Sequence, residues 1–440
     1  MTTATAPDDI LRTRLQAVES LILQRRLNDA AQQLNTLVRK NPADARVYLL
    51  GCRLAEASGN PAGSIEMARR AVGAAPGWSV ALTELAMALA RANQFPEAIA
   101  AAQQAVQMDP ENAGLLSRVI DVAHRAQRPD IALPWVEAAL QLAPASARAG
   151  LLLWRARDLG ALRRHAEAVA AYTELLALEP SSKAARFGRL QAAVAAGELE
   201  LARQDVTALL ADDPDSPELQ FWNEVAQGRV PPQQPAGIAQ ALFDGVAEVW
   251  DLHVVGSLRY RLPKQVAERL VEWHPDRQLN VLDLGCGTGL LGVALGPIQG
   301  ALIGVDISRP MIDQAARHNL YHRFHQVDVR EALEATPEGL YDVITALDVF
   351  IYMGDLTRAI PDAARILKPG GRLVFSCETA GEDEADLVLR PSMRYAHKAS
   401  AVEALCRSAG LTEVTIEPME LRQEGGTPLA GHLVVARKPA

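Results

Sequence analysis

The stretch VLDLGCGTG, residues 281–289, decides the fold of the second half of this 440-residue chain. A short apolar run leads into three glycines, Gly285, Gly287 and Gly289, in the spacing GxGxG. Glycines at a turn from strand to helix let backbone N–H groups approach a ligand closely. A dinucleotide-binding turn has the spacing GxGxxG, but Leu290 stands where its third glycine would be. The spacing therefore favours a ligand other than a dinucleotide.

Six more β-rich runs follow this turn and alternate with stretches long enough for helices. They are ALIGVD (301–306), RFHQVDV (323–329), YDVITALD (341–348), GRLVFSC (371–377), EVTIEP (413–418) and HLVVARK (432–438). Strands alternating with helices predict a doubly wound, mainly parallel sheet. The last two runs have no helix-length stretch between them, so we expect them to pair as an antiparallel edge.

Acidic residues stand at the ends of these runs. The second run ends at Asp306, 21 residues after Gly285, where a carboxylate can accept both hydroxyls of a ribose. The third run places Asp328 at the end of its strand, beside the expected position of a purine. Because the carboxyl ends of parallel strands open into one crevice, we expect the glycine turn, Asp306 and Asp328 to surround one ligand.

The first half of the chain is built from one repeat. Prolines recur with spacings of 34, 34, 34, 36 and 34 residues, at Pro42, Pro76, Pro110, Pro144, Pro180 and Pro214. Each follows two amphipathic helical patterns joined by a polar turn, which predicts one helical hairpin per unit. A small residue stands 12 residues before each proline, where the helices would cross: Ala30, Ser64, Ala98, Ala132, Ala168 and Ala202. The fifth unit is two residues longer, which predicts a wider turn near residues 162–165.

This half resembles tetratricopeptide repeats, in the third unit through Leu85-Ala86, Phe95, Ala98, Ala105 and Asp109-Pro110. The resemblance implies an all-α solenoid of about six hairpins over residues 11–228, closed by a helix at 216–227, after a flexible segment 1–10. A concave groove that binds a protein or peptide is its expected function, and a spacer or dimerisation scaffold is the alternative. The pairs Arg25-Arg26, Arg69-Arg70 and Arg163-Arg164 could line such a groove or belong to solvated helix faces.

The stretch GRVPPQQPAG, residues 228–237, has three prolines and no periodic apolar pattern. It predicts a short, semi-stiff linker at residues 229–237. A second domain then occupies residues 238–440.

This second domain resembles class I S-adenosylmethionine-dependent methyltransferases, through VLDLGCGTG, then GVD at 304–306, then QVDV at 326–329. The resemblance implies a Rossmann-like α/β fold and S-adenosylmethionine as cofactor. Asp283 and the loop Gly285–Gly289 would hold its methionine part, Asp306 the ribose, and Asp328 with the Val329 backbone the adenine. The implied cofactor-binding set also includes Cys286, Ile307, Met311 and Leu347, with Met311 as an apolar wall beside the adenine.

A more local resemblance is to bacterial methyltransferases that carry tetratricopeptide repeats. It rests on residues 242–253 (LFDGVAEVWDLH), where Trp250 stands in place of the usual Phe or Tyr, and on short patterns further along. His253 is expected to close this segment over the cofactor. After the fourth strand, ALDVF stands where amino-group methyltransferases of nucleic acids and glutamine have (N/D)PP(Y/F), which argues against those substrates.

Three residues are candidates for catalysis. Asp348 follows the fourth strand, toward which the methyl group should project, and capping the next helix is its alternative role. Tyr395 and His397 lie before the last predicted helix, where loops that shape the acceptor site are common, and a structural role is equally open. Methyl transfer requires mainly that the acceptor be positioned and desolvated, so few catalytic groups are needed.

Composition and charge exclude several classes of function. The net charge is −9, with 24 basic against 26 acidic residues up to Val230 and 20 against 27 after it, so nucleic acid is not an expected partner. We find no signal peptide and no membrane-spanning run, and four scattered cysteines fit the cytoplasm. No metal site is expected, because His318, His322 and His325 lack a carboxylate at matching spacing.

Three hypotheses for the function follow. The first is methylation of a protein or peptide side chain recruited by the repeat groove. Its alternative is methylation of a small molecule, a natural product or metabolite, with the repeats serving for homodimerisation or partner docking. The third hypothesis is a non-catalytic adaptor that only senses the cofactor.

Overall fold

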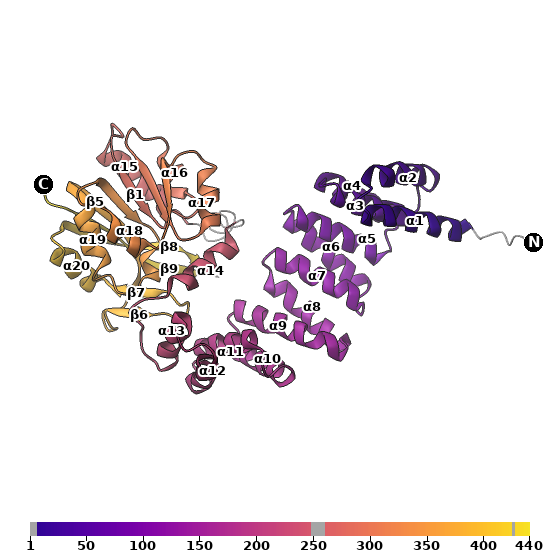
Figure 1. Ribbon diagram of the computed structural model, residues 1–440, viewed down its shortest axis with the longest axis horizontal. Helices are drawn as coiled ribbons and strands as arrows, with labels where there is room; N and C mark the ends of the chain where they lie inside the picture. Colours follow the sequence, from indigo (N-terminus) through magenta and orange to yellow (C-terminus); the bar gives the residue numbers. More distant parts are fainter. Residues whose placement is uncertain (1–6, 248–259, 425–426) are drawn as a thin grey trace, which may run out of the picture. The chain divides into compact units, whose positions relative to one another are not determined.

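The structure is a computed structural model that describes residues 7–247, 260–424 and 427–440 (Figure 1). Its internal contacts divide the chain into two compact units, Met1–Asp205 and Val206–Ala440. The division lies earlier in the chain than the predicted linker. Within the described residues the first unit contains only helices, and the second unit contains the sheet.

The first half of the chain consists of helical hairpins that follow one another. They are α1 (Pro7–Leu23) with α2 (Leu27–Lys40), α3 (Ala45–Ala57) with α4 (Pro61–Ala74), α5 (Ser79–Arg91) with α6 (Phe95–Met108), α7 (Ala113–Arg125) with α8 (Pro129–Leu142), α9 (Ala145–Ala161) with α10 (His165–Leu178), and α11 (Lys183–Ala196) with α12 (Leu199–Asp212). A further helix, α13 (Pro217–Ala226), is capped by Ser216, whose Oγ accepts the Leu219 N–H. The predicted hairpins and the predicted helix at 216–227 are confirmed.

The turn inside each hairpin contains one residue in the left-handed conformation. These residues repeat with the period of the prolines: Arg25, Gly59, Asn93, Gln127, Arg163 and Gly197. Arg25 and Arg163 therefore belong to turns, and Arg69 and Arg70 lie on the second helix of their hairpin. Consecutive hairpins meet through the second helix of one and the first helix of the next, for example α4 and α5, and also through their first helices, for example α5 and α7. Whether the arginine pairs line a binding groove stays a prediction.

The small residues predicted at the helix crossings are buried. The five alanines have no exposed surface, and Ser64 is 2% exposed. The prediction of a wider turn in the fifth unit is wrong. Its turn, 162–164, is as short as the others, and the extra residues lengthen α9, which has 17 residues where α5 and α7 have 13. Residues that fit a helix extend it at little cost, whereas a wider turn would leave backbone groups unpaired.

Ion pairs join the first helices of consecutive hairpins at Glu19–Arg53, Glu56–Arg91 and Glu84–Arg118. A contact of 3.0 Å between His124 Nε2 and Asp158 Oδ1 joins α7 to α9 in the same way. Glu84 and Asp158 are each only 5% exposed, so their carboxylates depend on these partners. The pairs fix the stacking of one unit on the next.

Replacing Arg118 by alanine is expected to destabilise the contact between α5 and α7 by about 1–3 kcal/mol, because Glu84 keeps its buried charge without this partner. Hydrogen exchange of the α5 and α7 amides measures this loss locally. Arg125→Ala, which breaks the exposed pair with Asp121 on the same helix, should cost under about 0.5 kcal/mol. Equal protection in both variants would contradict the prediction.

The second unit contains a nine-stranded sheet. Its strands are β1 (Val281–Leu284), β2 (Leu302–Asp306), β3 (Arg323–Gln326), β4 (Tyr341–Ala346), β5 (Leu367–Ala380), β6 (Leu387–Leu389), β7 (Tyr395–Lys398), β8 (Thr412–Glu424) and β9 (Thr427–Arg437). The order β3-β2-β1-β4-β5 is parallel, β9 pairs antiparallel with β5, and β8 pairs antiparallel with β9. The predicted runs and the antiparallel edge are confirmed. The short strands β6 and β7, which extend the sheet beside the end of β5, were not predicted.

Helices cover both faces of this sheet (Figure 1). On one face α15 (Leu262–Trp273) and α16 (Leu290–Leu295) pack on alternate strand residues such as Val281 and Val343. On the other face α18 (Val329–Ala335), α19 (Ala359–Ile366) and α20 (Ala399–Ser408) pack on the residues between them, such as Leu282 and Ile344. Burial of both faces explains why these strands are almost continuously apolar. The remaining helices are α14 (Ala236–Val246), α17 (Arg309–Ala316) and the short η2 (Phe350–Tyr352).

Candidate active site

The strand order reverses between β1 and β4. β1 lies between β2 and β4 and is parallel to both, so the carboxyl ends of the three strands lie at one edge of the sheet. In open α/β sheets this switch point is where a crevice forms and ligands bind. The glycine turn follows β1 at this point, and Asp306 ends β2 beside it.

All three glycines of the turn are left-handed, with φ of +62° at Gly285, +53° at Gly287 and +85° at Gly289. A Cβ atom at Gly285 would lie 2.4 Å from the Val349 side chain, and one at Gly289 would lie 3.1 Å from Ala315. A Cβ at Gly287 would meet nothing within 4 Å. Gly285 and Gly289 are thus required by packing, whereas Gly287 borders open space in which the backbone can meet a ligand.

Asp283 is a buried carboxylate under this turn. Its Oδ2 accepts a hydrogen bond from the Tyr321 hydroxyl at 2.6 Å, and its Oδ1 accepts one from the Thr345 hydroxyl at 2.8 Å. Burial raises the pKa of Asp283 to about 6, although both hydrogen bonds act in the opposite direction. The carboxyl group therefore gains or loses its proton near neutral pH.

Asp306 ties the glycine turn to the next helix. It accepts the Gly287 N–H at 2.8 Å on Oδ2 and the Ser308 N–H at 2.9 Å on Oδ1. The Ser308 hydroxyl in turn donates to Asp244 of α14 at 2.6 Å. Each oxygen of Asp306 accepts one backbone hydrogen bond in this arrangement, which leaves acceptor capacity for a pair of ligand hydroxyls.

Asp348 lies past the end of β4 within a network of charges that we call the Asp348 cluster: Asp348, Ser376, Glu378, Arg394 and Arg422. The Ser376 hydroxyl donates to Asp348 Oδ1 at 3.1 Å, and the Asp348 N–H donates to Ser376 Oγ at 2.7 Å. Arg422 of β8 binds Asp348 Oδ2 through Nη1 and Glu378 through Nη2. Arg394 binds the same Glu378 oxygen. Asp348 is therefore anchored in this cluster and does not cap a helix.

Comparison with known proteins follows the division of the chain. A family model for the tetratricopeptide repeat matches residues 15–77, 83–147 and 155–217, and one for a methyltransferase domain matches residues 255–413. The chain joins tetratricopeptide repeats to a methyltransferase domain. The glycine turn, Asp283, Asp306 and Asp348 all belong to the methyltransferase domain.

Each of the similar proteins described below matches less than half of the chain. A ubiquinone biosynthesis O-methyltransferase of Nitrosomonas europaea is 29% identical over 199 residues, which is 41% of this chain and 82% of that protein. The enzyme of the same name from Thiobacillus denitrificans is 27% identical over 227 residues, covering 46% and 94%. Among solved structures, the [4+2]-cyclase SpnF is 18% identical with a TM-score of 0.39, covering 48% of this chain and 98% of its own.

The protein is an S-adenosylmethionine-dependent methyltransferase. The residues around the glycine turn fit this cofactor, because they offer what its parts require. Gly287 gives backbone access, the buried Asp283 can pair with an amino group, and Asp306 can accept ribose hydroxyls.

The other predicted cofactor residues lie around this crevice or support it. The Cys286 N–H donates to the Val305 carbonyl, and Met311 and Leu347 are buried. Ile307 lies between Asp306 and Ser308, two residues with the contacts given above. Asp328 caps α18, and its side chain forms an ion pair with Arg330. Val329 is the first residue of that helix. Their contacts with the cofactor stay predictions.

Tyr395 and His397 have structural contacts. The Tyr395 hydroxyl donates to the Pro231 carbonyl at 2.9 Å, and His397 Nε2 donates to the Gly354 carbonyl at 2.7 Å. Tyr395 has no exposed surface, and burial lowers the pKa of His397, which keeps its ring neutral. Within the described residues no hydrogen bond links either side chain to Asp348. These contacts favour the structural role for both residues, and a catalytic role stays a prediction.

The contact of Tyr395 shows that the predicted linker packs on the methyltransferase domain. The Asp355 N–H donates to the Pro232 carbonyl at 2.7 Å, and Arg330 donates to Gln233 Oε1 at 2.6 Å. Gly354 allows this approach, since a Cβ there would lie 2.4 Å from the Pro232 carbonyl oxygen. Residues 231–234 are therefore bound to the domain along their length.

Tyr395→Phe is expected to leave kcat within about twofold and to reduce stability by about 1 kcal/mol, because one buried hydrogen bond to the linker is lost. Steady-state kinetics and the thermal unfolding midpoint measure the two effects. A large fall in kcat without a change in unfolding would instead identify Tyr395 as a catalytic residue.

Sequence reasoning missed the partners of the key carboxylates. Tyr321 and Thr345 lie 38 and 62 residues from Asp283, and Arg422 lies 74 residues from Asp348. No local pattern relates residues so far apart. Ser308 is the exception, since a serine before Arg309-Pro310 is a recognisable helix cap. Trp250 and His253 lie outside the described residues.

The raised pKa of Asp283 makes binding of the cofactor dependent on pH. The amino group of S-adenosylmethionine is charged below about pH 7.7 and pairs only with ionised Asp283. Affinity should therefore rise with pH and level off above the pKa of about 6, falling up to about tenfold per unit below it. Calorimetric titration between about pH 5 and 7 measures this trend. Asp283→Asn should abolish it, and a trend that persists in this variant would assign it to another group.

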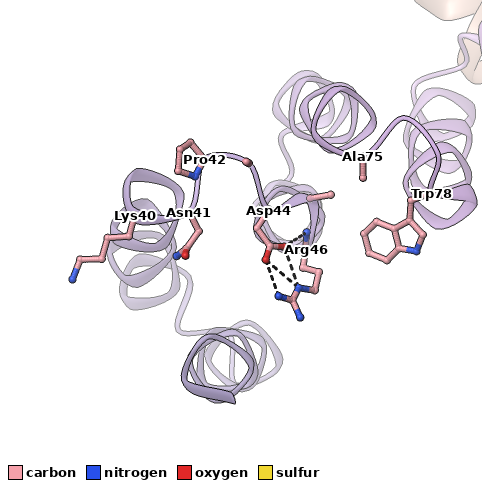
Figure 2. A pocket seen from close by; sticks show the side chains of 9 residues that line it. Lys40, Asn41, Pro42, Asp44, Arg46, Ala75 and Trp78 are labelled. Atoms are coloured by element: carbon pink, nitrogen blue, oxygen red, sulfur yellow. Dashed lines mark hydrogen bonds and ion pairs between the residues drawn. The ribbon is translucent and has the colours of Figure 1, made fainter. Parts of the chain in front are cut away.

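A hollow of about 620 Å³ lies in the repeats, away from these residues in the chain (Figure 2). It is lined by the turns before α3 and α5, with Lys40, Trp78 and the Asp44–Arg46 ion pair at its wall.

The described residues contain no cluster suited to a metal ion. Among the described helices, none combines the length and the apolar character that crossing a membrane requires.

Proposed function

We propose that this methyltransferase transfers the methyl group of S-adenosylmethionine to the hydroxyl oxygen of a small molecule. The observation that carries the proposal is the position of Asp348, a carboxylate fixed by Ser376 and Arg422 past the end of β4, at the switch-point edge of the sheet. The two relatives described above carry O-methyltransferase names, which favours oxygen and a small acceptor over a protein side chain.

Each residue has one task in this reaction. Asp283 and the glycine turn hold the methionine part, Asp306 holds the ribose, and Asp328, Val329 and Met311 surround the adenine. The cofactor supplies the methyl group. Asp348 accepts a hydrogen bond from the acceptor hydroxyl and removes its proton as the oxygen forms its new bond. The protein contributes mainly position and exclusion of water.

The repeats serve, in this proposal, to dock a partner protein or to form a homodimer. Tetratricopeptide repeats are typically protein-binding, but no contact of this array identifies the partner. Methylation of a protein side chain, our first expectation from the sequence, has no support from the relatives. A cytoplasmic location and the absence of nucleic acid and membrane partners stay predictions.

The partition of label between small molecules and proteins tests the proposal. The full-length protein is incubated with methyl-tritiated S-adenosylmethionine and an extract of the cells that make it, and the products are separated by filtration. We expect label in the small-molecule fraction that resists alkaline hydrolysis, as an ether does and a methyl ester does not. Asp348→Asn serves as the control. Label mainly in protein would show that the first hypothesis is correct.

A further inference from the structure

Asp348 has a backbone conformation that requires support. Its φ of +57° is left-handed, which costs a residue with a Cβ atom about 1 kcal/mol. Ser376 offsets this cost by bonding both the backbone N–H and the carboxylate of Asp348. The direction of the carboxylate is therefore set by the cluster around it rather than by the chain alone.

Arg422 is the charged member of the cluster that contacts Asp348. Its side chain is 8% exposed, and it joins Asp348 to Glu378, whose side chain is 4% exposed. Arg394, 15% exposed, binds Glu378 from another segment. A guanidinium is planar and always charged, so a buried one with two carboxylate partners has a fixed position. The two negative and two positive charges cancel within the cluster.

We propose that Arg422 is the positioning residue of the acceptor site, which holds the Asp348 carboxylate in one orientation so that the enzyme methylates phenolic or enolic hydroxyls in preference to aliphatic alcohols and amines. This inference rests on the proposed function and narrows its substrate class.

The chemistry of an ion-paired carboxylate is the reason for this preference. A carboxylate that is held in place is a strong hydrogen-bond acceptor but a weak base, so it suits an acceptor that releases its proton easily. A phenol gives up its proton far more easily than an aliphatic alcohol. In the step, the O–H bond breaks and its proton moves to Asp348. The oxygen forms a bond to the methyl carbon, the carbon–sulfur bond breaks, and its electron pair stays on sulfur.

Two tyrosines near Asp348 do not compete with it as bases. Burial raises the pKa of both Tyr260 and Tyr352, and the negative charge of Asp348 contributes in the same direction. Their hydroxyls stay protonated. Arg394, Arg422 and Glu378 are the other charged side chains of the cluster, and Arg390 acts electrostatically on Glu378. Asp348 is the group assigned to the acceptor proton.

The test uses the full-length protein with catechol and 4-nitrophenol as phenols and with cyclohexanol and benzylamine as the other acceptors. Arg422→Ala should lower kcat for the phenols roughly a hundredfold and leave the dissociation constant of S-adenosylmethionine within about twofold. Arg422→Lys keeps the positive charge but loses the planar guanidinium that bonds two carboxylates, and its kcat should be about tenfold higher than that of Arg422→Ala. The matched control is Glu417→Gln, on the same strand as Arg422, which breaks a half-buried ion pair with Arg269 of α15 and should change kcat less than twofold.

The outcomes separate this inference from the proposed function. If Asp348→Asn is inactive but Arg422→Ala keeps kcat within about threefold of the unmodified protein, the role of Arg422 is wrong and the proposed function stands. If the unmodified protein methylates cyclohexanol or benzylamine better than either phenol, or neither phenol at all, the substrate class is wrong. If Asp348→Asn is fully active, the proposed function itself fails. If Arg422→Ala does not bind S-adenosylmethionine, Ser376→Ala is tested in its place. This variant removes the hydroxyl that donates to Asp348, and we expect the same fall in kcat for the phenols.

Discussion

Replacing Asp306 by alanine is expected to weaken the binding of S-adenosylmethionine roughly a hundredfold to a thousandfold. The carboxylate offers charge-assisted hydrogen bonds to two ribose hydroxyls, and their loss amounts to about 3–4 kcal/mol. The Gly287 and Ser308 N–H groups lose their acceptor at the same time, so the glycine turn also loses its tie to α17. Both effects act on the bound cofactor.

Isothermal titration calorimetry with S-adenosylmethionine measures this loss directly. The matched control is Asp313→Ala on α17, an exposed carboxylate that pairs only with Arg309 among the contacts described, and it should bind like the unmodified protein. Asp306→Asn keeps the size of the side chain and should show an intermediate loss. Unchanged binding by Asp306→Ala would contradict the whole assignment of the crevice, including Asp283 and the glycine turn.

Asp348→Asn is expected to lower kcat by roughly 10²–10⁴-fold, with little change in the affinity for S-adenosylmethionine. Removal of a positioned group that accepts the substrate proton has an effect of this size. The amide keeps the shape of the carboxylate but cannot take up the proton, and it leaves Arg422 facing a neutral partner.

Single-turnover kinetics with a phenol acceptor separates this chemical step from product release. Asp362→Asn, a half-buried carboxylate on α19 that pairs with Arg365, is the control and should keep full activity. Loss of cofactor binding together with activity would show that Asp348 is structural. Retention of kcat would remove Asp348 from the mechanism.

The fold could be predicted from the sequence wherever a pattern repeats or is long. The proline period determined the hairpins, and continuous apolar runs determined the strands that helices cover on both faces. The strands β6 and β7 could not be predicted because they are only three and four residues long, and β7 pairs only with the end of β5. The greater length of α9 could not be predicted, because a two-residue insertion has no sequence signature that distinguishes a longer helix from a wider turn.

Candidate site residues could be predicted where they stand at or just after the end of a strand. Asp306 is the last residue of β2, and Asp348 follows β4. Asp283 lies within β1 and was assigned only from the resemblance. Their partners could not be found, because Tyr321, Thr345 and Arg422 are brought to them only by the pairing of distant segments. The contacts of Tyr395 and His397 could not be predicted for the same reason, because their partners Pro231 and Gly354 lie far away in the chain.

The transfer of a methyl group to oxygen is the central claim, and the carbon spectrum of the product tests it most directly. The full-length protein is supplied with S-adenosylmethionine labelled with carbon-13 in the methyl group and with catechol, and the product is examined by NMR. We predict the signal of an O-methyl carbon on a small molecule, present with the unmodified protein and absent with Asp348→Asn. An N-methyl signal, or label that stays with protein, would contradict the claim.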